Sequence, residues 1–260
     1  MEEFLPSLKE KHPPELEIFT HIEQRLQQLI ALRVDESDGY ALSPISRFPA
    51  KVAILLQVGL RRTIELTEAA IREANRGNIV SSAVVTRSAF ETACLVFDVM
   101  RRLEDIIEKD DAAALKDFDK TITNTILGHG PKAKTFILAE EYVVQNILTI
   151  IQRLSKQDDI PLEGFYEGLC EYAHPNYIGM MSVYTEADHT GGITTFTNAR
   201  TSRANNPFLW MGALATALDL VEESLKRWSK DSNRVATLAE RRVYEEGLWP
   251  AGTEFPISRQ

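Results

Sequence analysis

Cysteine is almost absent from this chain, and its longest uncharged apolar run is short. The two cysteines of the 260 residues, Cys94 and Cys170, lie far apart and form no C-x-x-C pair. We therefore expect no disulfide framework, no disulfide-linked partner and a reducing, cytoplasmic location. The longest uncharged apolar stretch, Ala204 to Leu218, is shorter than the ~18–20 residues that a membrane-spanning helix needs. The chain also does not open with a basic-then-apolar signal segment, so we expect no membrane association.

Positive charge is outweighed by negative charge. Lysine and arginine total 29, aspartate and glutamate total 38, and the net charge is −9 with a pI near 5.2. Because nucleic-acid binding relies on clustered cations, this balance argues against a general polyanion-coating surface but leaves a local basic site open. The motifs G-x-G-x-x-G, G-x-x-x-x-G-K-[ST], H-E-x-x-H and G-x-S-x-G do not occur, and the histidines are scattered. No cofactor and no metal site are predicted.

Helical periodicity is what the sequence does contain. Hydrophobic residues make up 44% of the chain and recur at steps of three and four, as on a helix with one buried face. Breakers divide this pattern into helices at about 13–34, 50–75, 79–109, 110–127, 131–156, 162–173 and 206–228. Residues 182–197 are rich in β-branched and aromatic types around a Gly-Gly turn, which predicts a β-hairpin.

These elements predict an all-α fold in one domain covering residues 1–260. The expected architecture is an antiparallel bundle of five to seven helices, with one small β-hairpin inserted before the last long helix. Residues 247–260 carry no periodic pattern and are expected to form an irregular C-terminal tail.

A polar stripe crosses the apolar helix expected at 79–109. Arg87, Glu91, Cys94 and Asp98 follow one another at i, i+4, i+7 and i+11, which places them on one face. An unpaired buried charge costs several kcal/mol, so the stripe needs partners. Two interpretations remain open. In the first, Arg87 and Glu91 form an intrahelical ion pair. In the second, the stripe forms the floor of a polar cleft in which the planar guanidinium of Arg87 binds an anionic group.

A second polar cluster gathers where the helix expected at 162–173 ends. His174 precedes a proline, which disfavours the helical conformation, so its ring can project from the bundle. The helix dipole favours the charged imidazole there. His174 therefore either caps a terminal carbonyl or transfers protons, with Tyr172, Asn176 and Tyr177 as candidate binding residues beside it.

The two clusters together resemble a known group of proteins. Arg87-Ser88-Ala89-Phe90-Glu91 provides an R-x-x-x-E helix, and Leu169-Cys170-Glu171-Tyr172-Ala173-His174-Pro175 provides a later x-x-H segment. This combination is similar to the HEPN superfamily, whose active members are dimeric, metal-independent endoribonucleases of toxin and phage-defence systems. The resemblance covers about Val52 to Trp228. It implies a HEPN-like bundle, a homodimer, RNA as a ligand, and His174 with Arg87 as the catalytic pair.

The chain departs from the active HEPN pattern at one point. Active members carry an arginine separated from the histidine by four to six residues, and here those positions hold Leu169, Gly168 and Glu167. Three functions therefore remain open. The first is a non-catalytic module that binds a partner or a small anionic ligand around Arg87, Glu91 and His174 in a defence or stress context. The second is a ribonuclease in which His174 takes the 2′-hydroxyl proton and Arg87 stabilises the transition state. The third is a structural component of an oligomer.

Overall fold

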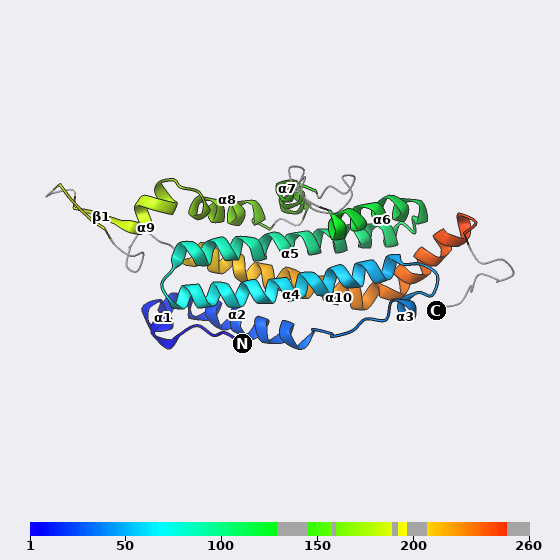
Figure 1. Cartoon of the computed structure of the whole chain (residues 1–260), viewed down its shortest axis with the longest axis horizontal. Helices are drawn as coiled ribbons and strands as arrows, with labels where there is room; N and C mark the ends of the chain where they lie inside the picture. Colours follow the sequence, from blue (N-terminus) through cyan, green and yellow to red (C-terminus); the bar gives the residue numbers. More distant parts are fainter. Residues whose placement is uncertain (129–144, 158–159, 189–191, 197–206, 249–260) are drawn as a thin grey trace. The chain divides into compact units, whose positions relative to one another are not determined.

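In the part of the chain that the structure describes, the regular elements are helices and one two-stranded hairpin (Figure 1). The computed structural model describes residues 1–128, 145–157, 160–188, 192–196 and 207–248. The predicted all-α class with one small hairpin is confirmed. The chain forms two compact units. The first comprises Met1–Arg33, Leu60–Cys94 and Ile151–Val221, and the second comprises Val34–Gly59, Leu95–Ile150 and Glu222–Gln260. The expectation of a single domain stays a prediction.

The described helices outnumber the five to seven that were expected. In chain order they are α1 (Pro6–Lys11), the 3₁₀ turn η1 (Pro13–Glu15), α2 (Leu16–Ala31), α3 (Gly39–Leu42), α4 (Phe48–Asn75), α5 (Ile79–Glu108), α6 (Ala112–Leu127), α7 (Ile147–Gln157), α8 (Leu162–Ala173), the π-helical turn η2 (Tyr177–Met181), α9 (Ser182–Tyr184) and α10 (Pro207–Glu245). The additional helices α1, α3 and α9 are too short to show an apolar period.

Three boundaries differ from the expectation. The last helix, expected to end at Trp228, continues to Glu245, because Val235, Leu238 and Ala239 resume the buried face after a polar stretch. The hairpin expected at 182–197 is shorter, with β1 (Thr185–Asp188) paired antiparallel to β2 (Ile193–Phe196). The helix expected at 131–156 was wrong at residues 145 and 146, which are not helical: α7 begins at Ile147, after Asn146, whose side chain accepts a hydrogen bond from Leu148 N at 3.0 Å. Residues 129–144 of that expected helix and residues 249–260 of the expected tail lie outside the described residues.

The first unit is held together by apolar packing and by a few polar contacts between helices. Phe19, Ile22 and Leu26 line the buried face of α2. The rings of Phe90 on α5 and Phe165 on α8 meet edge to face, with centroids 6.3 Å apart. These contacts fix α8, and therefore the segment that follows it, against α5.

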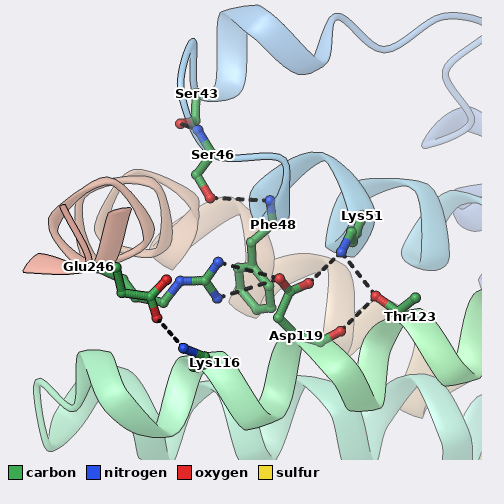
Figure 2. Close-up of polar contacts among 9 residues, drawn as sticks. Ser43, Ser46, Phe48, Lys51, Lys116, Asp119, Thr123 and Glu246 are labelled. Atoms are coloured by element: carbon green, nitrogen blue, oxygen red, sulfur yellow. Dashed lines mark hydrogen bonds and ion pairs between the residues drawn. The ribbon is translucent and has the colours of Figure 1, made fainter. Parts of the chain in front are cut away.

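The second unit has its own apolar core and a polar tie at its edge. The core side chains come from α4, α5, α6 and α10 and include Phe48, Val99, Leu103, Leu115, Phe118, Val235 and Leu238. In the polar tie, Lys51 Nζ lies 2.6 Å from a carboxylate oxygen of Asp119 and 2.9 Å from Thr123 Oγ1 (Figure 2). Arg242 reaches the same carboxylate at 3.4 Å. Asp119 thereby links α6 to both α4 and α10.

Among the described residues, helix α5 is the one candidate for a membrane-spanning helix. An 18-residue window with a mean hydropathy of 1.3 makes it long and apolar enough to cross a membrane by length and composition. Of that window, 44% is buried within the protein, and the core helix of a soluble protein has the same composition. The expectation of no membrane association therefore stays a prediction.

Candidate functional site

Arg87 is the centre of a small polar cluster between α5 and α8. Its Nε donates to Glu91 Oε1 at 2.9 Å, one turn along α5. Its Nη2 donates to the hydroxyl of Tyr166 on α8 at 2.8 Å, and the guanidinium carbon lies 5.0 Å from the centre of the Tyr166 ring. The intrahelical pair, one of the two interpretations of the polar stripe, is therefore present. Arg87 also ties α5 to α8.

The electrostatics of this cluster leave it nearly neutral. Burial disfavours the charged form of Arg87, but the hydrogen bond with Tyr166 and the charge of Glu91 outweigh it and raise the pKa of the guanidinium. Burial also raises the pKa of the Tyr166 phenol above its ordinary value, against the opposing effect of Arg87. At neutral pH the cluster therefore holds one cation, one carboxylate and a neutral phenol.

His174 ends α8 and is exposed to solvent. Its backbone N–H donates to the carbonyl of Cys170 at 3.0 Å, and its backbone is extended. Within the described part of the chain, no hydrogen bond or ion pair joins the His174 ring to another group. Tyr166, which holds Arg87, lies eight residues earlier on α8, or about 12 Å along a helix axis. The pairing of His174 with Arg87 stays a prediction.

The other candidate residues have different surroundings. Tyr172 is only 6% exposed, and burial raises the pKa of its phenol. Asp98 is 2% exposed and belongs to the second unit, where Arg102 lies 3.9 Å away. Both side chains are therefore buried within the protein, and Asp98 is not part of the Arg87 cluster.

Asn176 and Gly179 shape the turn after α8. Asn176 accepts a hydrogen bond from Gly179 N at 2.8 Å and donates to Glu171. A Cβ at Gly179 would lie 2.2 Å from the carbonyl oxygen of His174, so only glycine allows this close approach. Tyr177, which follows Asn176 in this turn, is 73% exposed.

Large apolar side chains are exposed from Tyr177 onward. We call the set formed by Tyr177, Ile178, Met180, Met181 and Tyr184 the Tyr177–Tyr184 surface, and each of these side chains is exposed. Sequence reasoning placed only Tyr177 among the candidate residues. An apolar run predicts burial more often than exposure, so the sequence alone gives no clear signal of such a surface.

The sequence on either side of this surface is acidic. Between Leu162 and Phe196 the sequence contains no lysine or arginine but five carboxylate side chains. Glu167, Glu171 and Glu186 are exposed.

Charged groups also line two cavities within the second unit. One, of about 420 Å³, is lined by Glu108, Asp110, Asn233, Arg234 and Arg241 among others, and the other, of about 360 Å³, by Arg102, Asp105 and Asp117 among others. Arg241 donates to both carboxylate oxygens of Asp110, at 2.7 and 2.8 Å. Its charge is therefore already balanced.

Comparisons of this chain with protein-family models, with curated proteins and with solved structures found no match. The resemblance to the HEPN superfamily stays a prediction. Cys94 and Cys170 form no disulfide, and the described residues contain no group of three or more histidine, cysteine or acidic side chains placed to hold a metal ion.

Proposed function

We propose that this protein is a non-catalytic helical module that binds another protein through the Tyr177–Tyr184 surface. The observation that carries the proposal is the exposure of five large apolar side chains within eight consecutive residues. Apolar burial is the dominant favourable contribution to association, and soluble proteins that act alone rarely expose contiguous apolar patches. Met180 and Met181 suit a binding surface because the flexible thioether adapts to a partner's shape.

The charges around the surface specify the kind of partner. Exposed carboxylates before and after the surface, in residues 162–196 that contain no lysine or arginine, attract cations and repel anionic surfaces such as nucleic acid and acidic lipid. The proposed partner is a protein segment with apolar side chains flanked by lysine or arginine. An amphipathic basic helix is the simplest segment of this kind.

The Arg87 cluster supports binding without catalysis. Arg87 uses two of its donors on Glu91 and Tyr166, so an anionic ligand would have to compete with a carboxylate already in place. His174 has no arginine at the three preceding positions that active HEPN proteins use. We therefore assign the cluster a positioning role, in which it holds α8 and the turn that follows it.

A labelled amphipathic helical peptide of leucine and lysine is a suitable probe. Fluorescence anisotropy should show saturable binding to the wild-type protein, because the peptide matches both the apolar surface and the carboxylates that flank it in the sequence. The double variant Met180→Ser/Met181→Ser should bind at least about tenfold more weakly, since burial of each methionine contributes about 1.5–3 kcal/mol. The matched control is Ile54→Ser/Val58→Ser, which removes two exposed apolar side chains from α4 and should bind like the wild type.

Two results would overturn the proposal. Equal loss of binding in both double variants would show that the peptide has no preference for the Tyr177–Tyr184 surface. Equally tight binding of a leucine–glutamate peptide would contradict the assigned charge of the partner.

An endoribonuclease is the second candidate, and the exposed, unengaged ring of His174 favours it. The test is incubation of labelled mixed-sequence RNA with the protein in EDTA, beside His174→Ala. The binding proposal expects intact RNA in both samples. Cleavage by the wild type alone, with an unchanged melting temperature for the variant, would replace the binding module with a metal-independent ribonuclease.

A further inference from the structure

Within the part of the chain that the structure describes, no element covers strand β2 of the hairpin. β1 and β2 pair with Thr185 opposite Phe196 and Asp188 opposite Ile193. All four residues of β2 are exposed, and the side chain of Phe196 is 82% exposed. An isolated two-stranded hairpin is at best marginally stable in water, and three or more strands, or a covering helix, are normally required. The hairpin therefore has the properties of an incomplete sheet.

The two outer edges of the hairpin differ in charge. β1 has the sequence Thr-Glu-Ala-Asp, whereas β2 has the uncharged sequence Ile-Thr-Thr-Phe. Proteins usually protect a free edge with charged residues, proline or a bulge, and β2 carries no charge and no proline. Its β-branched and aromatic residues also have high strand propensity. β2 is therefore the edge suited to accept another strand.

We infer that β2 pairs antiparallel with β2 of a second copy of this chain, giving a four-stranded sheet across a twofold axis. Residues that lie opposite each other in an antiparallel pair point to the same side of the sheet. A twofold axis perpendicular to the sheet therefore places one residue opposite its own copy, and this residue is Thr194 or Thr195 when the middle of β2 is paired. In the first case Ile193 lies opposite Thr195 of the partner subunit, and in the second Thr194 lies opposite Phe196 of the partner subunit. Neither arrangement brings charges together.

Charge argues against one alternative pairing between copies, and symmetry argues against the other. Pairing β1 with β1 of the partner subunit would bring Glu186 and Asp188 close to the same carboxylates of the other copy, and like charges opposite each other are destabilising. Pairing β1 of one copy with β2 of the next would be head-to-tail and would continue as an open fibre. Only the β2–β2 pairing is both neutral and closed.

Sedimentation analysis of the full chain over a range of concentrations tests the inference. The wild type should form a species of twice 29.3 kDa. Thr194→Lys/Thr195→Lys places cations at the axis in either register and should weaken dimerisation at least about tenfold, a free-energy change of about 1.4 kcal/mol. Thr185→Lys adds a lysine to β1 and should remain dimeric. Circular dichroism verifies that the helices of each variant are intact.

Amide hydrogen exchange gives a second readout that needs no variant. The β2 amides of the wild type should exchange more slowly at concentrations that favour the dimer. A wild type that stays monomeric at its highest soluble concentration, or a dimer unaffected by Thr194→Lys/Thr195→Lys, would overturn the inference. The proposed protein-binding function is independent, because the monomeric variant should still bind the leucine–lysine peptide.

Discussion

At the residue scale, the role of Arg87 is set by a partner distant in the sequence. The i, i+4 spacing of Arg87 and Glu91 was enough to predict their ion pair as one of two interpretations. Tyr166 lies 79 residues away from Arg87, so no local spacing could assign it as the second partner. The contact became visible only when α8 was placed against α5. It changes Arg87 from a free anion-binding group into a tie between helices.

Tyr166→Phe tests this positioning role. The change removes the hydroxyl that accepts the hydrogen bond from Arg87 Nη2 and keeps the ring, so the free energy of unfolding should fall by about 1–3 kcal/mol. Urea denaturation measures the loss. Tyr177→Phe removes a hydroxyl from an exposed tyrosine and should leave stability unchanged. Equal stability of both variants would contradict the positioning role.

The buried phenols also make stability dependent on alkaline pH. Burial raises the pKa of Tyr166 and Tyr172 above the ordinary value of about 10. The folded state therefore holds their protons more tightly than the unfolded state. This contribution is complete below about pH 10 and is lost as pH rises through the folded pKa. Tyr172→Phe should flatten the alkaline fall in the free energy of unfolding, and an unchanged slope in urea titrations would contradict this account.

At the element scale, boundaries marked by strong local signals were predictable. Helix α8 begins and ends as expected because a proline precedes it and another follows His174, and α5 begins after the Gly77 turn with its positive φ of 77°. The end of α10 was not predictable. Its polar stretch after Trp228 interrupts the apolar period, and only packing in the second unit shows that Val235 resumes it. Residues 182–184, expected in the hairpin, form the short helix α9.

Two glycines in helices should respond to alanine in opposite directions. A Cβ at Gly59 on α4 would lie 2.4 Å from Val96 Cγ2 on α5, so Gly59→Ala should destabilise the protein by about 1–3 kcal/mol through overpacking. At Gly164 on α8 no atom lies within 4 Å of such a Cβ, and Gly164→Ala should stabilise by about 0.5–1 kcal/mol. Thermal melts of both variants measure the difference. Shifts of the same sign would contradict the described α4–α5 packing.

At the scale of the whole molecule, fold class followed from the sequence but the candidate binding surface did not. Periodicity predicts which side chains face inward, and it predicted an all-α protein correctly. It cannot show that an apolar run such as Ile178 to Met181 is turned outward, because that depends on the tight turn at Gly179. The exposed surface therefore appeared only in the structure.

The net charge of −9 gives a direct expectation for polyanions. The protein should show no retarded complex with RNA in electrophoretic shift assays at low salt, because its net charge and the carboxylates that flank the Tyr177–Tyr184 surface in the sequence repel phosphate. Binding whose affinity falls linearly with the logarithm of salt concentration would reveal a cationic face and favour the ribonuclease alternative.

The most direct measurement of the central claim is hydrogen-exchange mass spectrometry of the full chain with and without the leucine–lysine peptide. The account expects slower exchange confined to the segment that carries Tyr177 to Tyr184 and its flanking carboxylates. At the peptide concentration that half-saturates the wild type, Met180→Ser/Met181→Ser should show much less protection. Protection located elsewhere in the chain, or no protection at saturating peptide, would contradict the assignment of this surface as the binding site.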